Sequence, residues 1–174
     1  GGAHSGIGLD TLNVFVGVHA MGHPAGVMFG FVSLLFNGIF DKFPNIRFAF
    51  LEGGVGWMLM ARERCDSSYR AFTPTDPNDR LFKLQDGEDV ATYIQRQVDE
   101  GRIFVGVEGD EPDLPYAVKV FGNGPFMFST DFPHEVNTEI CKHEVEEILG
   151  NPELTDNDKL AIMHSNAERF YGFA

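Results

Sequence analysis

The stretch Phe126-Met-Phe-Ser-Thr-Asp131-Phe-Pro-His134 decides the fold that the sequence predicts. Five uncharged residues precede Asp131, and a proline stands on either side of the run, as is typical of a short strand buried on both faces. Asp131 follows this strand directly, and α/β folds keep their chemistry at the carboxyl ends of parallel strands. The same carboxylate could instead start a turn or cap the next helix, and this residue alone leaves both interpretations open.

Two further strands end in acidic residues. Residues 46–51 stop at Glu52, which two glycines follow, and residues 103–107 stop at Glu108, with Glu111 close behind. Because the carboxyl ends of parallel strands meet at one edge, we expect these carboxylates to converge. A convergent set of this kind builds an oxygen-rich metal site or an acid–base site. The alternative is coincidence, since loops favour acidic residues in general.

Helices alternate with these strands, which indicates a parallel sheet. Apolar residues at helical spacing predict helices at about 10–20, 24–42, 57–69, 89–98, 112–121, 137–149 and 156–171. Asp10 or Thr11 is the expected N-cap of the first helix, and Pro24 suits the first turn of the second, which should be heavily buried. The polar segment 73–89, rich in proline and aspartate, is expected to form a loop at the rim.

Three strands cannot close an eight-stranded TIM barrel, whose usual length is about 250 residues. We therefore expect residues 1–174 to form a single, partial α/β barrel domain that corresponds to the second half of a (β/α)8 barrel. Open parallel edges are rarely left uncovered, so the chain should associate with a missing N-terminal half or with another copy.

Composition excludes several classes of function. A net charge of −13 disfavours nucleic acid and anionic membranes as partners. Cys65 and Cys141 are the only two cysteines, lie far apart in the sequence and lack the spacing of a metal motif. This favours a reduced, cytoplasmic protein over a disulfide scaffold. The longest apolar stretch, residues 27–43, is interrupted by polar residues and predicts a core helix rather than a membrane span. No secretory signal is visible at the N-terminus.

Four segments in order resemble the amidohydrolase-related family, the metal-dependent TIM-barrel enzymes that include aminocarboxymuconate-semialdehyde decarboxylase. They are His23-Pro24, residues 36–54, residues 128–134 and residues 166–172. The likeness runs from about residue 20 to the end, with a gap near 73–90. It implies that this chain carries roughly strands five or six to eight of the barrel.

The resemblance also implies a divalent metal, usually zinc. The family holds it through a His-x-His pair after the first strand, a histidine after the fifth and an aspartate after the eighth. Asp131 matches the last of these ligands, whereas the His-x-His pair belongs to the half that this chain does not contain. The fifth-strand histidine is either His4 or a residue just upstream of Gly1; the upstream residue is preferred because no strand precedes His4.

Glu52 stands where decarboxylases of this family carry a histidine after the sixth strand. A glutamate can still act as a general base or as a metal ligand, so Glu52 and Asp131 are the predicted catalytic residues. His134 and Glu108 are predicted to bind substrate, and Glu111 is a further candidate for the pocket. His134 could equally be a surface residue.

Other residues have simpler interpretations. His19 is expected to be a hydrogen-bonded histidine on a packed helix, and Arg62 and Arg64 are expected to form surface salt bridges rather than to clamp a carboxylate. The glycines at 53, 54 and 56 lack the lysine and the spacing of a phosphate loop.

Two functions from different classes remain. The first is a metal-dependent hydrolase or decarboxylase acting on a small carboxylated or aromatic compound, in which the metal activates a water molecule and polarises a substrate oxygen. The second is a non-catalytic half-barrel with a binding or structural role.

Overall fold

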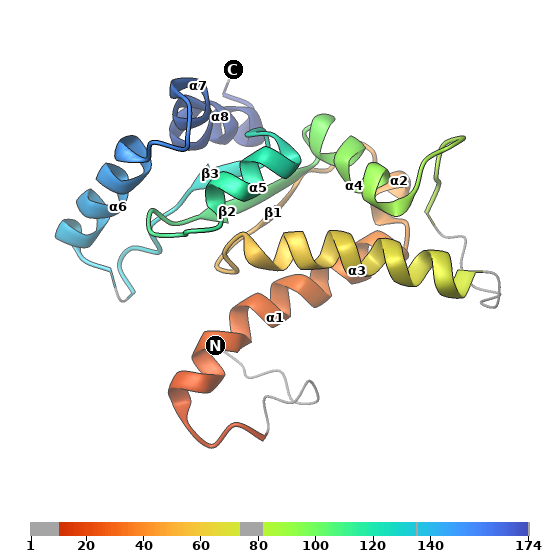
Figure 1. Ribbon diagram of the computed structural model, residues 1–174, viewed down its shortest axis with the longest axis horizontal. Helices are drawn as coiled ribbons and strands as arrows, with labels where there is room; N and C mark the ends of the chain where they lie inside the picture. Colours follow the sequence, from red (N-terminus) through yellow and green to blue (C-terminus); the bar gives the residue numbers. More distant parts are fainter. Residues whose placement is uncertain (1–10, 74–81, 135, 174) are drawn as a thin grey trace.

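A computed structural model describes residues 11–73, 82–134 and 136–173 of the chain (Figure 1). The elements follow in the order α1 (Phe15–Phe36), α2 (Ile39–Lys42), β1 (Phe48–Phe50), α3 (Gly56–Phe72), α4 (Val90–Asp99), β2 (Ile103–Val107), α5 (Leu114–Phe121), β3 (Phe126–Phe128), α6 (Thr138–Gly150), α7 (Asp156–Leu160), a π-helical turn η3 (Ala161–Ser165) and α8 (Asn166–Tyr171).

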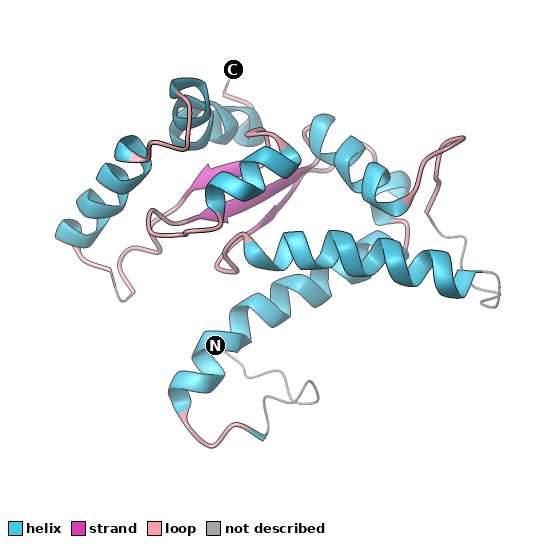
Figure 2. Cartoon of the chain, in the orientation of Figure 1, coloured by secondary structure: helices cyan, strands magenta, loops and turns pink. Residues whose placement is uncertain are grey.

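The described strands form one parallel sheet in the order β1-β2-β3, with helices around it (Figure 2). Phe50 is in register with Val105, and Val105 is in register with Phe126. The predicted alternation of strands and helices is confirmed, although β1 and β3 are shorter than the apolar runs that predicted them.

The two faces of the sheet carry different residues, because successive side chains of a strand point to opposite faces. One face carries Phe50, Val105 and Phe126, which belong to the main apolar core together with Trp57 and Leu35 of the helices. Ala49, Phe104, Gly106 and Met127 alternate with the core residues and therefore belong to the other face. Most helices thus pack on the first face, whereas α8 reaches the second face through Phe170, whose ring contacts Phe104.

Helix α1 differs from its prediction. It runs without a break through Pro24, where the sequence predicted a boundary between two helices, and it begins at Phe15 rather than near Thr11. The proposed N-cap Asp10 lies outside the described residues. A proline inside a helix removes one backbone hydrogen bond and costs about 3 kcal/mol in general. Gly22, His23 and Pro24 nevertheless lie within the helix rather than at a boundary between two helices.

The burial of α1 is also lower than expected. Phe31 and Leu35 are fully buried, but Phe15 and Val16 each remain 77% exposed, and this first half of the helix projects away from the sheet (Figure 1). By length and composition, α1 alone among the helices of the described residues could cross a membrane, a criterion that core helices also meet. The second half of α1 contacts the core through Phe31 and Leu35, but Phe29 is 44% exposed, so the heavy burial predicted for residues 24–42 is found only in part.

The segment that precedes α4 is less peripheral than predicted. Residues 74–81 of the expected rim loop lie outside the described residues, but Phe82 is buried and its ring contacts those of Tyr69 and Tyr93. Asp89 then starts α4 through a capping box with Thr92, in which each side chain accepts the other's backbone N–H. The end of this loop is therefore part of the core.

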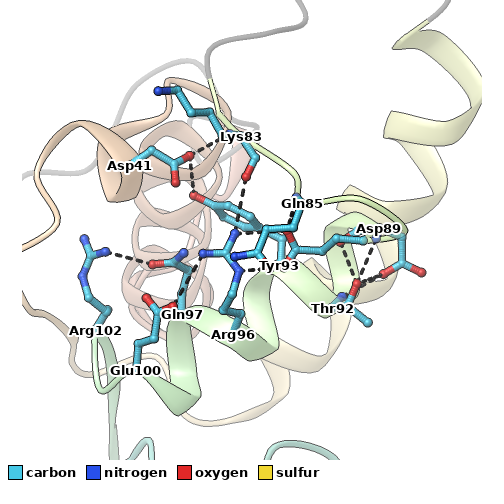
Figure 3. A network of polar contacts seen from close by, with 11 residues as sticks. Asp41, Lys83, Gln85, Asp89, Thr92, Tyr93, Arg96, Gln97, Glu100 and Arg102 are labelled. Atoms are coloured by element: carbon cyan, nitrogen blue, oxygen red, sulfur yellow. Dashed lines mark hydrogen bonds and ion pairs between the residues drawn. The ribbon is translucent and has the colours of Figure 1, made fainter.

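A buried arginine joins the start of β2 to the segment that leads into β1. The Arg102 guanidinium donates to the carbonyl oxygens of Phe40, Phe43 and Ile46 at 2.7, 2.9 and 3.2 Å, and to the Gln97 side chain at 3.1 Å. Beside it, the Asp41 carboxylate accepts the Tyr93 hydroxyl and the Lys83 backbone N–H (Figure 3). This polar network fixes α2 and α4 against the sheet.

The C-terminal helix closes the opposite end of the sheet from the acidic loops. Asn166 donates to the Phe126 carbonyl at 2.8 Å, and Arg169 donates to the Gly124 carbonyl at 2.6 Å. Arg47, just before β1, donates to the Phe170 carbonyl at 3.1 Å. The Phe170 ring also lies 5.2 Å from that of Phe104 in β2. Helix α8 therefore contacts all three strands or the residues that lead into them.

We predict that Arg102→Ala lowers the free energy of unfolding by about 3 kcal/mol, because the variant leaves buried carbonyl oxygens without donors. Urea denaturation followed by circular dichroism measures the change. The exposed Arg64→Ala is the control and should stay within about 0.5 kcal/mol of the unaltered chain. Equal stability of the two variants would contradict the assigned role of Arg102.

Candidate active site

The carboxyl ends of the three strands meet at one pocket, as the sequence predicted. The pocket has a volume of about 120 Å³ and is lined by Leu51, Glu52, Gly54, Gly106, Glu108, Glu111, Ser129 and Asp131. Leu51, Gly106 and Ser129 continue the sheet face that the core leaves free. The pocket is therefore built from strand ends that carry four carboxylates.

Two of these acids have an unusual backbone. Glu52 has a φ of 62° and Asp131 a φ of 53°, and these are the non-glycine residues with positive φ in the described part of the chain. This left-handed conformation costs a side chain of ordinary type roughly 1 kcal/mol or more and gathers at functional sites. Glu52 stands two residues after the end of β1 and Asp131 three residues after the end of β3, so the conformation turns the chain sharply at the rim.

Asp131 is paired with the histidine that follows it. The His134 Nδ1 atom lies 2.8 Å from the Asp131 Oδ1 atom, and the His134 backbone N–H donates to the Asp131 carbonyl at 3.0 Å. The Asp131 side chain is 29% exposed and that of His134 is 71% exposed. His134 thus orients the carboxylate from the solvent side, which is compatible with its predicted contact with substrate.

Glu52 is paired with His23, for which the sequence analysis predicts no chemical role. The His23 Nδ1 atom lies 2.9 Å from the Glu52 Oε2 atom, so α1 reaches the pocket. The His19 ring stands edge-on to that of His23, with centroids 5.8 Å apart. A signal was present in the sequence, because His19 and His23 are one helical turn apart, but the expected break at Pro24 concealed it.

Glu111 joins the loops that follow β1 and β2. Its Oε2 atom accepts the Val55 N–H at 2.7 Å, and its Oε1 atom accepts the Glu108 N–H at 2.8 Å. Burial raises the pKa of Glu111 to about 7, although both backbone bonds act in the opposite direction. Its carboxyl group therefore changes charge near neutral pH.

The acids also influence one another. Burial raises the pKa of Glu108, and the charges of Asp110, Asp131 and Glu52 raise it further. Helix α6 packs closely against the loop after β2, since a side chain at Gly109 would collide with the backbone of Glu144. Burial and the charges of Glu108 and Asp110 raise the pKa of Glu144 as well. The pocket therefore favours a proton or a cation among its carboxylates.

The described residues do not complete a metal site. No group of three histidine, cysteine, aspartate or glutamate side chains among them is arranged to hold a metal ion. Asp131 could supply one ligand, while His4 lies outside the part of the chain that the structure describes. A full set of ligands would thus need residues beyond those described.

Arg62 and Arg64 are not brought to the pocket. Both belong to α3; the Arg62 guanidinium lies over the Phe121 ring at 5.8 Å, and Arg64 is exposed. Arg62 lines a separate groove with Asp113 and Tyr116. Neither arginine clamps a ligand of the acidic pocket.

The family model for amidohydrolases (Amidohydro_2) matches residues 9–173, and the chain belongs to this family. The match includes the whole of α1, which is thus part of the family domain. This confirms the resemblance that the sequence motifs indicated. No significant match was found among curated proteins.

Solved structures show the same fold in part. The 5-carboxyvanillate decarboxylase of Sphingomonas paucimobilis has a TM-score of 0.62 and 21% identity, covering 81% of this chain and 38% of that one. Two structures of the Novosphingobium aromaticivorans enzyme have a TM-score of 0.63 and 18% identity, covering 94% of this chain and 42% of theirs. Both contain manganese and a hydroxy-methoxy-nitrobenzoic acid. The chain thus spans 38% to 42% of the length of these three structures.

The raised pKa of Glu111 predicts a pH dependence of stability. Its folded-state value of about 7 exceeds the ordinary 4.5, so its contribution is fully present below pH 4.5 and is lost as the pH rises through about 7. Relative to that of Glu111→Gln, the free energy of unfolding of the unaltered protein should therefore fall by up to about 3 kcal/mol over this interval. Urea denaturation at a series of pH values measures the difference, and a pH-independent difference would contradict the assignment.

Proposed function

We propose that the chain is the C-terminal part of a metal-dependent TIM-barrel enzyme that decarboxylates or hydrolyses a small carboxylated or aromatic compound. The observation that carries the proposal is the convergence of Glu52, Glu108 and Asp131 at the carboxyl ends of three parallel strands, in a chain of the amidohydrolase family. The names of the structural relatives favour decarboxylation of a hydroxybenzoate.

The proposed role of each residue follows from the groups that its side chain contacts. Asp131, held by His134, is the proposed metal ligand and stands at the rim outside the packed layers of the sheet. Glu52 is the proposed acid–base group; its carboxylate faces His23, which can exchange a proton with it. Glu108 and His134 are proposed to bind the substrate.

We propose that the metal is zinc or manganese and that it draws ligands from both halves of the barrel. The family resemblance favours zinc, whereas the relatives from Novosphingobium contain manganese. His4 is the proposed ligand from the N-terminal loop if it takes the place of the fifth-strand histidine. The remaining ligands would come from the N-terminal half of the barrel.

The test is the release of carbon dioxide from 5-carboxyvanillate and related hydroxybenzoates by the full-length enzyme, loaded in parallel with zinc or manganese. Turnover of at least one compound is expected. Absence of turnover across the panel with either metal would argue against the decarboxylase and leave the hydrolase to be tested with the corresponding esters and amides.

We predict that Asp131→Ala abolishes metal retention and turnover in the full-length enzyme while the fold persists, because the residue lies at the rim. Elemental analysis, the decarboxylation assay and circular dichroism measure the three properties. Metal content and rate equal to those of the parent enzyme would refute the role of Asp131.

Glu52→Gln separates the two roles open to this residue. As an acid–base group, its loss should lower kcat by about 10²- to 10⁴-fold with metal retained. As a ligand, its loss should lower the metal content as well. An unchanged rate would exclude Glu52 from the chemistry.

A non-catalytic half-barrel is the second candidate, and it is favoured by the lack of a three-ligand cluster among the described residues. In either case we propose that the chain associates with its N-terminal half or with another copy, in the cytoplasm, without nucleic acid or membrane as partner.

We predict that the isolated 174-residue chain does not retain zinc or manganese after dialysis, because tight catalytic sites use about three protein ligands with outer-shell support. Elemental analysis decides this. About one ion per chain, kept against a mild chelator, would show that residues of this chain suffice.

A further inference from the structure

We propose that Glu111 is a positioning residue that clamps the loop after β1 to the loop after β2 and thereby holds Glu52 and Glu108 at a fixed separation in the pocket. The catalytic consequence rests on the proposed function. The clamp itself does not.

The geometry of the carboxylate supports this role. Each oxygen accepts one backbone N–H, from Val55 at 2.7 Å and from Glu108 at 2.8 Å, so one side chain engages both loops. The two donors are 53 positions apart in the chain but adjacent at the rim. Bonds from N–H groups to an ionised carboxylate are about twice as strong as neutral ones, and here they lower the Glu111 pKa that burial raises.

Helix α3 requires such a partner. Val55 is its N-cap and has no side-chain oxygen, and the first turn of α3 carries no acidic residue. The first N–H groups of a helix have no partner within the helix, and a negative charge near them is favourable. Glu111 supplies from another loop what the local sequence of α3 lacks.

The space around the carboxylate is matched to it. Gly54 has a φ of 64°, and a Cβ atom there would stand 3.1 Å from the Glu111 Oε2 atom. Val55 is 1% exposed, and its bond to Glu111 is partly buried. Asp113, two residues after Glu111, is exposed and lines a different groove. Glu111 is thus the acid whose two oxygens accept the Val55 and Glu108 N–H groups.

The clamp acts on Glu52 through the backbone. Glu52 stands three residues before Val55 in a left-handed conformation, which a loop keeps only when its surroundings impose it. Release of Val55 would let this segment relax and move the Glu52 carboxylate relative to Glu108. Displacements of about 1 Å can cost about 10²-fold in rate.

The test compares Glu111→Ala, Glu111→Gln and the matched control Asp113→Ala in the full-length protein by hydrogen–deuterium exchange. Glu111→Ala should exchange about tenfold to hundredfold faster at the Val55 and Glu108 amides. Glutamine keeps one acceptor oxygen and turns its NH₂ group to the other donor, so Glu111→Gln should release one of the two loops. Asp113→Ala should match the parent.

The second measurement is kinetic and uses a substrate found in the decarboxylation assay. Glu111→Ala should lower kcat about tenfold or more with metal content unchanged, and Glu111→Gln should fall between it and the parent. Faster exchange with an unchanged kcat would overturn the positioning role and leave only a structural cap. Unchanged exchange at both amides in Glu111→Gln would overturn the clamp, even if Glu111→Ala failed to fold. If the parent shows no activity at all, the proposed function fails while exchange still decides the clamp.

Discussion

The burial of β2 on both faces and along both edges is the constraint on which the remaining structure depends. All five residues from Ile103 to Val107 are buried, and the strand pairs with β1 on one side and β3 on the other. A strand in this position must be apolar, because all of its side chains are buried. Its register is also fixed, because a slip by one residue would exchange its two faces. Arg102, directly before β2, adds a polar lock by holding the carbonyl groups that lead into β1. The register of the sheet then determines where each strand ends.

The chemistry of the rim follows from that register. Once β1, β2 and β3 are aligned, their final residues deliver carboxylates to one pocket, and these must share protons or cations because burial and mutual repulsion oppose full ionisation. Glu111 differs from the other acids of this set, because burial raises its pKa to about 7 and its two oxygens accept two backbone N–H groups. The histidines at 23 and 134 each face one of the remaining acids. The site is therefore a set of paired groups rather than a row of independent acids.

Periodicity and strand-end chemistry were sufficient to predict the sheet, most helix positions and the convergence of the acids. Three features escaped prediction for physical reasons. Pro24 removes one backbone hydrogen bond from α1 but does not end the helix, so the rule that proline marks a helix boundary predicted the wrong limit. The His23–Glu52 pair joins residues 29 positions apart, and no local pattern encodes such a contact. Glu111 appeared as one acid among several, because the amide groups that distinguish it become neighbours only after the sheet has formed.

The closure of the sheet by α8 has a consequence for the order of events during synthesis. The bonds from Asn166 to Phe126 and from Arg47 to Phe170 span 40 and 123 residues. Contacts of such long range form late, since a long loop must be closed before they bring any gain. On the ribosome, the strands and their acidic rim are made before the helix that secures their other ends. The nascent chain must therefore keep an incompletely fastened parallel sheet until α8 emerges, and in that interval it is most dependent on chaperones and most exposed to wrong strand pairing.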